Sequence, residues 1–183
     1  GSVNPVEVSG LSSVIQVSAG ASHSCATLSS GEIKCWGAGT SGKLGYGAET
    51  AKATPVSVSG LPDAGTGLSA VFAVAASNHS CALLSDKTVK CWGHNNEGEL
   101  GLGDTTARGG NPGEMGDSLP VVDVGTGRTV TALAAGRRHV CAVLDDATTK
   151  CWGANDSGQL GNDSTAGSSV PVTVTGITTA LSV

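Results

Sequence analysis

The chain has 183 residues, a formal net charge of −5, 28 glycines and only five aromatic residues. This length suits one compact domain, and frequent glycine with few charged side chains favours short strands and tight turns over long helices. Arg137 and Arg138 form the only basic pair, and a nucleic-acid binder carries a broader basic face, so we expect no nucleic-acid partner. The longest apolar run, residues 70–76, is too short to cross a bilayer, and we expect no membrane insertion.

In chain order, one unit of sequence occurs three times. Each unit opens with an apolar strand, continues with a His-x-Cys strand, a turn and a Lys-Cys-Trp-Gly strand, and ends with a glycine-rich loop and a Pro-Val strand. The opening strands read SVIQVSAG, AVFAVAAS and TVTALAAG, and the closing strands read PVEV, PVSV, PVVDV and PVTV. The first cysteines of the units, Cys25, Cys81 and Cys141, are 56 and 60 residues apart. Four short strands in a unit of this length predict a β-propeller blade.

The predicted fold is all-β, with three four-stranded propeller blades in one repeat domain over residues 1–183. A sandwich of two antiparallel sheets is the alternative, and the close repetition favours blades. The expected boundaries are 5–10 for the closing strand of a preceding unit, 11–60, 61–124 and 125–176 for the three repeats, and 177–183 for the opening strand of a following unit. Propellers close with about four to eight blades. We therefore expect a partial propeller, either a fragment of a longer one or a subunit that completes a ring or filament with its own copies.

Three longer segments carry a resemblance to a known family. They read GASHSCATLSSGEIKCWGAGTSGKLGYG, NHSCALLSDKTVKCWGHNNEGELGLG and GRRHVCAVLDDATTKCWGANDSGQLG. Their shared elements are the Gly-x-x-His entry, the Trp-Gly pair and the Asn-x-x-Gly-x-Leu-Gly loop. These segments resemble repeats of the regulator-of-chromosome-condensation type over nearly the whole chain. The resemblance implies a propeller, seven-bladed in the family, and its cysteine-bearing form implies a bacterial surface or secreted protein.

The six cysteines form three pairs of identical spacing. The pairs are Cys25 with Cys35, Cys81 with Cys91, and Cys141 with Cys151. The first pair lies symmetrically about Ser30, so a three-residue turn would place its members opposite each other, with Cα atoms about 4.5 to 5.5 Å apart. That separation suits a disulfide. We expect one disulfide in each repeat, each contributing about 2.5 to 3 kcal/mol, and hence a secreted or cell-surface location.

A metal site is the competing interpretation of the same residues. Each repeat has a histidine two positions before its first cysteine, so both side chains project from one face of a strand. The histidines are His23, His79 and His139. With the opposite cysteine they would provide three ligands for zinc, although no Cys-x-x-Cys spacing occurs. The resemblance instead implies structural histidines whose ring nitrogens hydrogen-bond the blade backbone. We expect no cofactor, and free buried thiols are the third alternative.

The tryptophans are expected to pack between blades. They are Trp36, Trp92 and Trp152, and each follows a cysteine, so each points to the opposite face of its sheet. No catalytic site is expected, because the chain has no Gly-x-Ser-x-Gly elbow, no phosphate-binding loop and no His-Glu-x-x-His. The glycine-rich segments 94–104 and 154–163 miss the spacing of a calcium-binding EF-hand and are interpreted as turns.

Segments that depart from the repeat are candidate partner contacts, since recognition often lies in loops on a rigid scaffold. Residues 107–119 form the larger insertion, and residues 61–69 form a smaller one. The candidate contact residues of the larger insertion are Arg108, Glu114, Met115 and Asp117. Arg137 and Arg138 are a second candidate. A solvated loop without a partner is the alternative.

The sequence thus predicts a non-catalytic extracellular or surface protein that assembles through open blade edges with its own copies or with further blades. One alternative is a recognition module of a larger secreted propeller that binds a protein partner. A zinc-binding protein is the other. The resemblance implies roles from nucleotide exchange to β-lactamase inhibition and surface recognition. Nucleotide exchange fits poorly, because paired disulfides are rare in the nucleus and cytosol.

Overall fold

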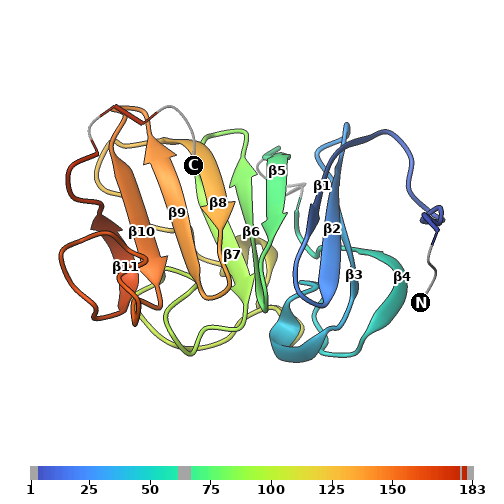
Figure 1. Ribbon diagram of the computed structural model, residues 1–183. Helices are drawn as coiled ribbons and strands as arrows, with labels where there is room; N and C mark the ends of the chain where they lie inside the picture. The colour runs from blue at the N-terminus through green and yellow to red at the C-terminus, as the bar shows by residue number, and fades with distance from the viewer. Residues whose placement is uncertain (1–3, 62–66, 178, 181–183) are drawn as a thin grey trace.

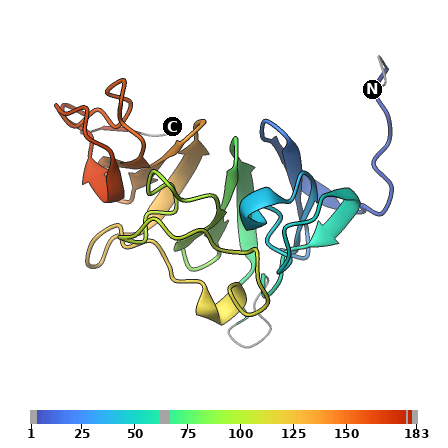
Figure 2. The same ribbon diagram turned by 90° about the horizontal axis from the view of Figure 1, so that it is seen from below.

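The computed structural model describes residues 4–61, 67–177 and 179–180, and its strands form three antiparallel sheets that stand side by side (Figure 1). Seen from below, the sheets fan outward like neighbouring blades (Figure 2). The all-β propeller fold predicted from the repeats is confirmed. The helices of the described residues are two three-residue 3-10 turns, Thr40–Gly42 and Gly116–Ser118. None of the helices in this part of the chain could cross a membrane.

The sheets follow the chain order, and within each sheet every strand pairs with the next one in sequence. Sheet 1 contains β1 (Val14–Ala19), β2 (His23–Leu28), β3 (Ile33–Gly37) and β4 (Lys52–Ser57). Sheet 2 contains β5 (Ala70–Ala75), β6 (His79–Leu84) and β7 (Val89–Gly93). Sheet 3 contains β8 (Val130–Ala135), β9 (His139–Leu144), β10 (Thr149–Gly153) and β11 (Ser168–Thr173).

The hairpin between the second and third strand of each sheet has the same turn. One residue of each turn takes a positive φ, namely Gly31 at 82°, Lys87 at 69° and Ala147 at 64°. For the two residues with side chains this conformation costs about 1 kcal/mol. A preceding aspartate offsets part of that cost by accepting a backbone N–H two residues on, Asp86 from Thr88 at 3.0 Å and Asp146 from Thr148 at 3.1 Å. The three turns therefore give the same register from different residues.

The second repeat differs from the prediction because its PVVDV segment, residues 120–124, forms no strand and sheet 2 has three strands. The bond from Val122 N to Val89 O, 2.8 Å, matches the bond from Val58 N to Ile33 O, 2.9 Å. Counting back two residues places Pro120 where sheet 1 has Val56, the residue paired with Cys35. That is a hydrogen-bonded position of the ladder, and proline has no N–H to donate there.

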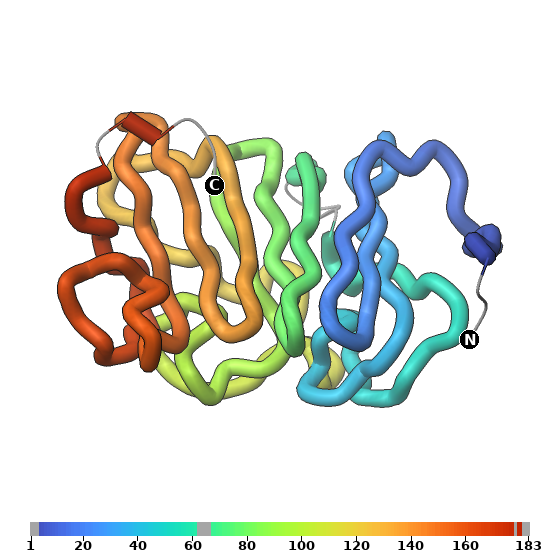
Figure 3. The backbone as a smooth tube through the Cα atoms, in the orientation of Figure 1, coloured from blue at the N-terminus to red at the C-terminus, as the bar shows by residue number. Residues whose placement is uncertain are grey.

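The segments at the two ends of the chain were expected to form strands of neighbouring units. Residues 5–8 form no strand, and Figure 3 shows this segment leading away from sheet 1. Of the expected opening strand 177–183, residues 178 and 181–183 lie outside the described residues, as do residues 62–66 of the smaller insertion. Ala180 donates its backbone N–H to Ala147 O at 3.1 Å. Ala70 and Val130 make the same bond, to Gly31 O and Lys87 O, where sheets 2 and 3 begin.

The core lies between the sheets, in two clusters of buried apolar side chains. We call the contact of sheets 1 and 2 the first joint, and that of sheets 2 and 3 the second joint. Each joint contains the disulfide of the earlier sheet and the tryptophan of the later one, Trp92 in the first and Trp152 in the second. Each sheet therefore offers one face to the sheet before it and the other to the sheet after it.

Candidate interaction surfaces

Each sheet is cross-linked by one disulfide between its second and third strands, in the pairing expected from the repeat. The Cα–Cα separations are 4.1, 4.0 and 4.1 Å for Cys25–Cys35, Cys81–Cys91 and Cys141–Cys151. Leu28 N donates to Glu32 O, and alternation along the ladder then puts the first cysteine pair at a non-hydrogen-bonded position. Antiparallel strands bring their Cα atoms closest at such positions, which is why each hairpin can close its own bridge.

The sulfur atoms are therefore not available as thiolate ligands, which a zinc site would need. Across the described residues, no group of three or more His, Cys, Asp or Glu side chains is placed to hold a metal ion. The three-ligand arrangement considered from the sequence is thus not assembled in this part of the molecule.

Each joint contains one buried tryptophan that bonds the loop of the preceding sheet. Trp92 and Trp152 are fully buried, and their indole N–H groups donate to the backbone carbonyls of Lys43 (3.1 Å) and Glu99 (2.9 Å). Each carbonyl belongs to the glycine-rich loop of the preceding sheet. A Cβ added at the glycine two residues further on, Gly45 or Gly101, would lie 2.7 or 2.8 Å from the indole nitrogen. The loop glycine is therefore needed for the ring to approach the backbone.

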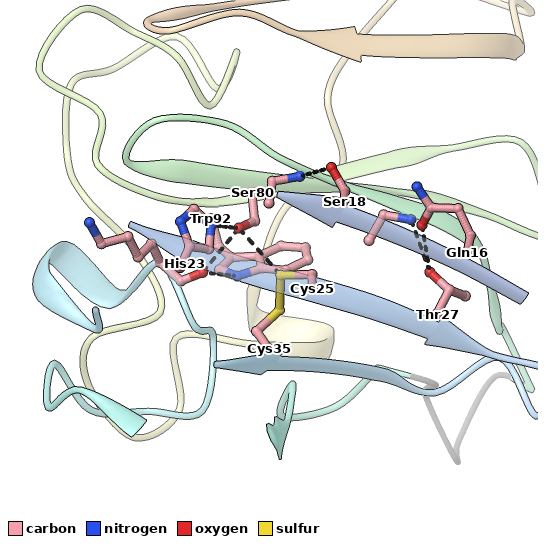
Figure 4. The surroundings of a disulfide bond; sticks show 11 residues. Gln16, Ser18, His23, Cys25, Thr27, Cys35, Ser80 and Trp92 are labelled. Atoms are coloured by element: carbon pink, nitrogen blue, oxygen red, sulfur yellow. Dashed lines mark hydrogen bonds between the residues drawn. A yellow bond between two sulfur atoms is a disulfide. The ribbon is translucent and has the colours of Figure 1, made fainter. Parts of the chain in front are cut away.

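The first joint also has a polar core, drawn in Figure 4. His23 Nε2 lies 2.8 Å from the Ser80 hydroxyl, which donates to Lys43 O at 3.0 Å. Burial, with a smaller contribution from the Lys43 charge, lowers the pKa of His23 to about 4. The bonds expected from the His23 ring to the blade backbone are not made, because Nε2 faces the serine of the next sheet and Nδ1 has no hydrogen-bond partner.

The second joint lacks this serine. Val140 stands where the first joint has Ser80, and neither ring nitrogen of the buried His79 has a hydrogen-bond partner. Burial, with smaller contributions from other histidines, lowers the pKa of His79 to about 3. His79 is therefore held in its neutral form as a space-filling side chain.

The loop residue before the repeated Leu-Gly pair also differs between the joints. Lys43 is buried, and its ammonium group donates to Ser22 Oγ (3.1 Å) and Asn78 Oδ1 (2.9 Å), while burial lowers its pKa. In the second joint the corresponding residue is Glu99, which lies 2.9 Å from His94 Nδ1. Sequence reasoning missed both residues, although their place before the Leu-Gly pair of the repeat was visible.

The larger insertion folds back onto the loop between β3 and β4, where Gly47 N donates to Gly109 O at 3.2 Å. One carboxylate oxygen of Glu114 accepts the backbone N–H groups of Gly109, Gly110 and Asn111 at 2.9, 3.0 and 3.0 Å. Burial raises the pKa of Glu114, but the hydrogen bonds from Asn111 and the glycines outweigh it, so the pKa lies below its ordinary value. Met115 is buried in the first joint. Both candidate contact residues therefore make contacts within the chain, and a contact with a partner stays a prediction.

The other residues expected in contacts have varied surroundings. Arg108 forms a bidentate pair with Asp104, at 2.9 and 2.7 Å, and this hydrogen bonding lowers the pKa of Asp104 to about 2. Asp117 lies in the second 3-10 turn. Arg138 pairs with Glu97 (2.8 Å) and Asp156 (3.0 Å) and so bridges sheets 2 and 3, whereas Arg137 is exposed. Arg137 is thus an exposed cation among these residues.

The two outer faces of the array carry apolar side chains that no sheet covers among the described residues. On sheet 1, Val14 and Val17 are 40% and 66% exposed, and Trp36 is half-buried. On sheet 3, a pocket of about 490 Å³ lies over the disulfide and the Leu160–Gly161 loop. Both surfaces are of the kind that the two joints bury, which makes them candidate interaction surfaces.

Sequence comparisons identify the repeat. Two family models of the regulator of chromosome condensation (RCC1) repeat match the chain, one at residues 14–43, 74–99 and 130–159, the other at 30–83, 88–143 and 151–183. Curated relatives include the ultraviolet-B receptor UVR8 of Arabidopsis thaliana, 35% identical over 160 residues. Another is the probable E3 ubiquitin-protein ligase HERC6 of Homo sapiens, 33% identical over 159 residues. These matches cover 86% and 85% of the chain, but only 33% and 14% of the two relatives.

Solved structures agree with the fold. Yeast RCC1 (Prp20) bound to Kap60 has a TM-score of 0.73 at 20% identity, covering 90% of this chain and 38% of that one. Prp20p from Saccharomyces cerevisiae, described with its binding to Gsp1p and histones, has a TM-score of 0.74 at 21% identity, covering 93% and 40%. The fold and the joints thus define a β-propeller repeat protein. Since the repeat matches run along most of its length, the chain belongs to the RCC1 repeat family.

Proposed function

We propose that this chain is a non-catalytic interaction and assembly module that works outside the cytoplasm through the outer faces of its blade array. The observation that carries the proposal is the exposure of apolar faces on sheets 1 and 3 that match the faces buried in the joints. Apolar surface in water favours association, and an uncovered blade face has the shape of a blade partner.

The three disulfides support the extracytoplasmic part of the proposal, because such bridges persist in oxidising compartments and are rare in the cytosol. The non-catalytic part rests on the use of the repeated polar residues. His23 and Ser80 are committed to the first joint, and the cysteines to bridges, so none of these groups is free to act as a nucleophile or base.

Native mass spectrometry without reductant tests the proposal. We expect a mass six hydrogens below that of the fully reduced chain, from six oxidised thiols, together with defined multimers whose abundance rises with protein concentration. A chain that carries free thiols after expression in an oxidising compartment would contradict the disulfide part. Bound zinc in stoichiometric amount would contradict it as well.

A recognition module of a larger secreted propeller is the second candidate function. It is supported by the solved relatives described with Kap60, Gsp1p and histones, and by the exposed Arg137. The same mass measurement separates the two candidates. An oxidised chain that stays monomeric at every concentration favours the recognition module over self-assembly.

A further inference from the structure

The Leu160–Gly161 loop of sheet 3 corresponds to the loops that contact a tryptophan in the two joints, but no tryptophan contacts Gly161 among the described residues. In the two joints, an added Cβ at Gly45 or Gly101 would collide with the indole of Trp92 or Trp152 at 2.7 to 3.1 Å. Gly161 is the third glycine of this kind, and there an added Cβ would meet only Val174 within 4 Å. The same loop geometry thus leaves open the space that an indole ring fills elsewhere in this chain.

The pocket around that space is built from joint-forming residues. Its apolar walls include Cys141, Cys151, Leu160, Val174 and Ile177. The corresponding residues of sheet 1 are Cys25, Cys35, Leu44, Val58 and Leu61, and all of them are 0–2% exposed. Ile177 is 44% exposed, against 2% for Leu61, because no sheet lies over it among the described residues. The pocket is therefore lined by residues that correspond to those of a joint, but no second sheet covers them among the described residues.

The opposite end of the array has the matching surface. Val14 and Val17 of sheet 1 are 40% and 66% exposed. The residues at these positions in sheet 2 are Ala70 and Ala73, which are 5% and 0% exposed in the first joint, and those in sheet 3 are Val130 and Leu133, 1% and 6% exposed in the second. Trp36 is half-buried, whereas Trp92 and Trp152 are fully buried. Sheet 1 thus presents a tryptophan and an apolar strand to solvent.

The polar groups of the two ends are also complementary. Ser24 has the position in sheet 1 that Ser80 has in sheet 2, where it bonds His23 and the Lys43 carbonyl. At the free face of sheet 3, His139 and the Gln159 carbonyl stand in the positions of those two partners. The loops of sheets 1 and 2 have the charged residues Lys43 and Glu99 at the position of Gln159. Gln159 is uncharged, so it places no charge against the incoming sheet. The end faces can therefore form the serine-bridged type of joint seen between sheets 1 and 2, which the second joint with Val140 does not form.

We propose that sheet 1 of one copy of this chain docks on sheet 3 of a second copy, with Trp36 inserted into the pocket beside Gly161. This inference rests on the assembly function proposed above and assigns it a surface. Trp36 then donates its indole N–H to the Gln159 carbonyl, and Ser24 bonds His139. Such a head-to-tail contact produces a ring or a filament, depending on the rotation between copies.

One segment of the chain competes with this contact. Ala180 N bonds Ala147 O, and an incoming Val14 would need the same carbonyl, by analogy with Ala70 at Gly31 and Val130 at Lys87. Ile177 lies in the pocket wall and belongs to the docking surface. Removing residues 178–183 should therefore strengthen the association of copies while leaving the pocket intact.

The test uses sedimentation equilibrium without reductant on the full chain, on the chain lacking residues 178–183, and on two variants of each. Trp36→Ala removes the inserted side chain, and Ile177→Arg places a charge in the pocket. Both residues are partly or largely exposed in the single chain, so folding should survive, and thermal melting checks this. We expect each variant to weaken association by about 30-fold or more, as for an interface hot spot. Val121→Ala, at a 48% exposed site on neither end face, is the matched control and should leave association unchanged.

Mixing the variants gives the decisive result. The Trp36→Ala chain keeps its pocket and the Ile177→Arg chain keeps its tryptophan, so an equimolar mixture should form a 1:1 dimer that grows no further. Iodide quenching of tryptophan fluorescence should also fall as the unmodified chain associates, because Trp36 is the one of the three tryptophans that is not fully buried.

Two results would overturn the inference in distinguishable ways. If the unmodified chain associates and neither variant weakens it, assembly remains but uses another surface. If the full and shortened chains both stay monomeric up to about millimolar concentration, with unchanged quenching, the docking and the assembly function both fail, since a contact weaker than this would be only about 4 kcal/mol.

Discussion

The first and second joints share one backbone design and differ in their polar chemistry. Both bury a tryptophan whose N–H donates to a loop carbonyl of the preceding sheet. In the first joint Ser80 connects His23 to that carbonyl, whereas in the second Val140 leaves His79 without a partner. The repeat therefore tolerates different buried polar side chains in the joint, as long as the tryptophan, the loop glycine and the apolar surface are kept.

The tryptophans should show the largest effect. Trp92→Ala and Trp152→Ala each remove a fully buried ring and its hydrogen bond, so each should lower the free energy of unfolding by about 3 to 5 kcal/mol. Trp36→Ala, at the outer face, should cost the single chain less than about 1 kcal/mol. Urea unfolding of the three variants at a concentration where the chain is monomeric measures the contrast, and equal losses would show that the outer tryptophan is already packed.

Removing a disulfide should have the next largest effect. Replacing Cys81 and Cys91 together by alanine opens a loop of 10 residues' separation and should lower the free energy of unfolding by about 2 to 3 kcal/mol. The double variant of Cys25 and Cys35 should lose a similar amount, because both pairs are fully buried in a joint. Unfolding with and without reductant checks the assignment, since reductant should lower the stability of the parent more than that of either variant.

Acid should weaken both joints through their histidines. The folded pKa values, about 4 for His23 and about 3 for His79, lie below the ordinary value of 6.5. The unfolded chain therefore binds more protons between these values, and stability falls as pH decreases, by up to about 1.4 kcal/mol per pH unit for each histidine. The loss begins below about pH 6.5 and continues until each folded pKa is passed.

The two histidines can be separated by substitution. His79→Leu should flatten the pH dependence between about pH 6.5 and 3, and His23→Leu should flatten it between about pH 6.5 and 4. Melting temperatures at half-unit pH intervals measure both slopes. An unchanged slope in the His79→Leu chain would mean that this ring is not held neutral by burial.

Ser80 should show the smallest of these effects. Ser80→Ala leaves His23 Nε2 and the Lys43 carbonyl each with one bond fewer, and should cost about 1 to 2 kcal/mol. Ser24→Ala, at the same position on the uncovered face of sheet 1, is the matched control and should be nearly neutral in the single chain. Similar costs at both positions would show that the serine acts within its own sheet and not across the joint.

Several features followed from sequence because they depend on residues close along the chain. The hairpins place each cysteine opposite its partner, so a spacing of ten residues was sufficient to predict the pairing seen in the structure. The repeat likewise predicted the propeller class, since a blade cannot bury both faces alone. In contrast, PVVDV was predicted as a strand, and the one-residue shift that puts Pro120 at a hydrogen-bonding position became visible only through the Val122–Val89 bond.

The larger insertion, residues 107–119, is another feature whose placement the sequence did not predict. From sequence, Glu114 and Met115 were contact candidates on a loop that departs from the repeat, but this loop packs so closely on the loop between β3 and β4 that a Cβ at Gly42 would lie 2.2 Å from Gly110 N. The expected partner of each histidine was backbone, whereas its actual surroundings depend on a residue 57 or 61 positions further along, in the next sheet. No local pattern encodes which side chain faces it there.

The sequence by itself determined the repeat unit, most of the strands, the cysteine pairing and the tryptophan positions, because hydrophobic period, turn residues and spacing act over short stretches of chain. Only the tertiary structure decided which polar groups are satisfied at each joint, where the insertion lies and which tryptophan is left half-buried. Those outcomes depend on the packing of one sheet against the next, which brings together residues more than fifty positions apart.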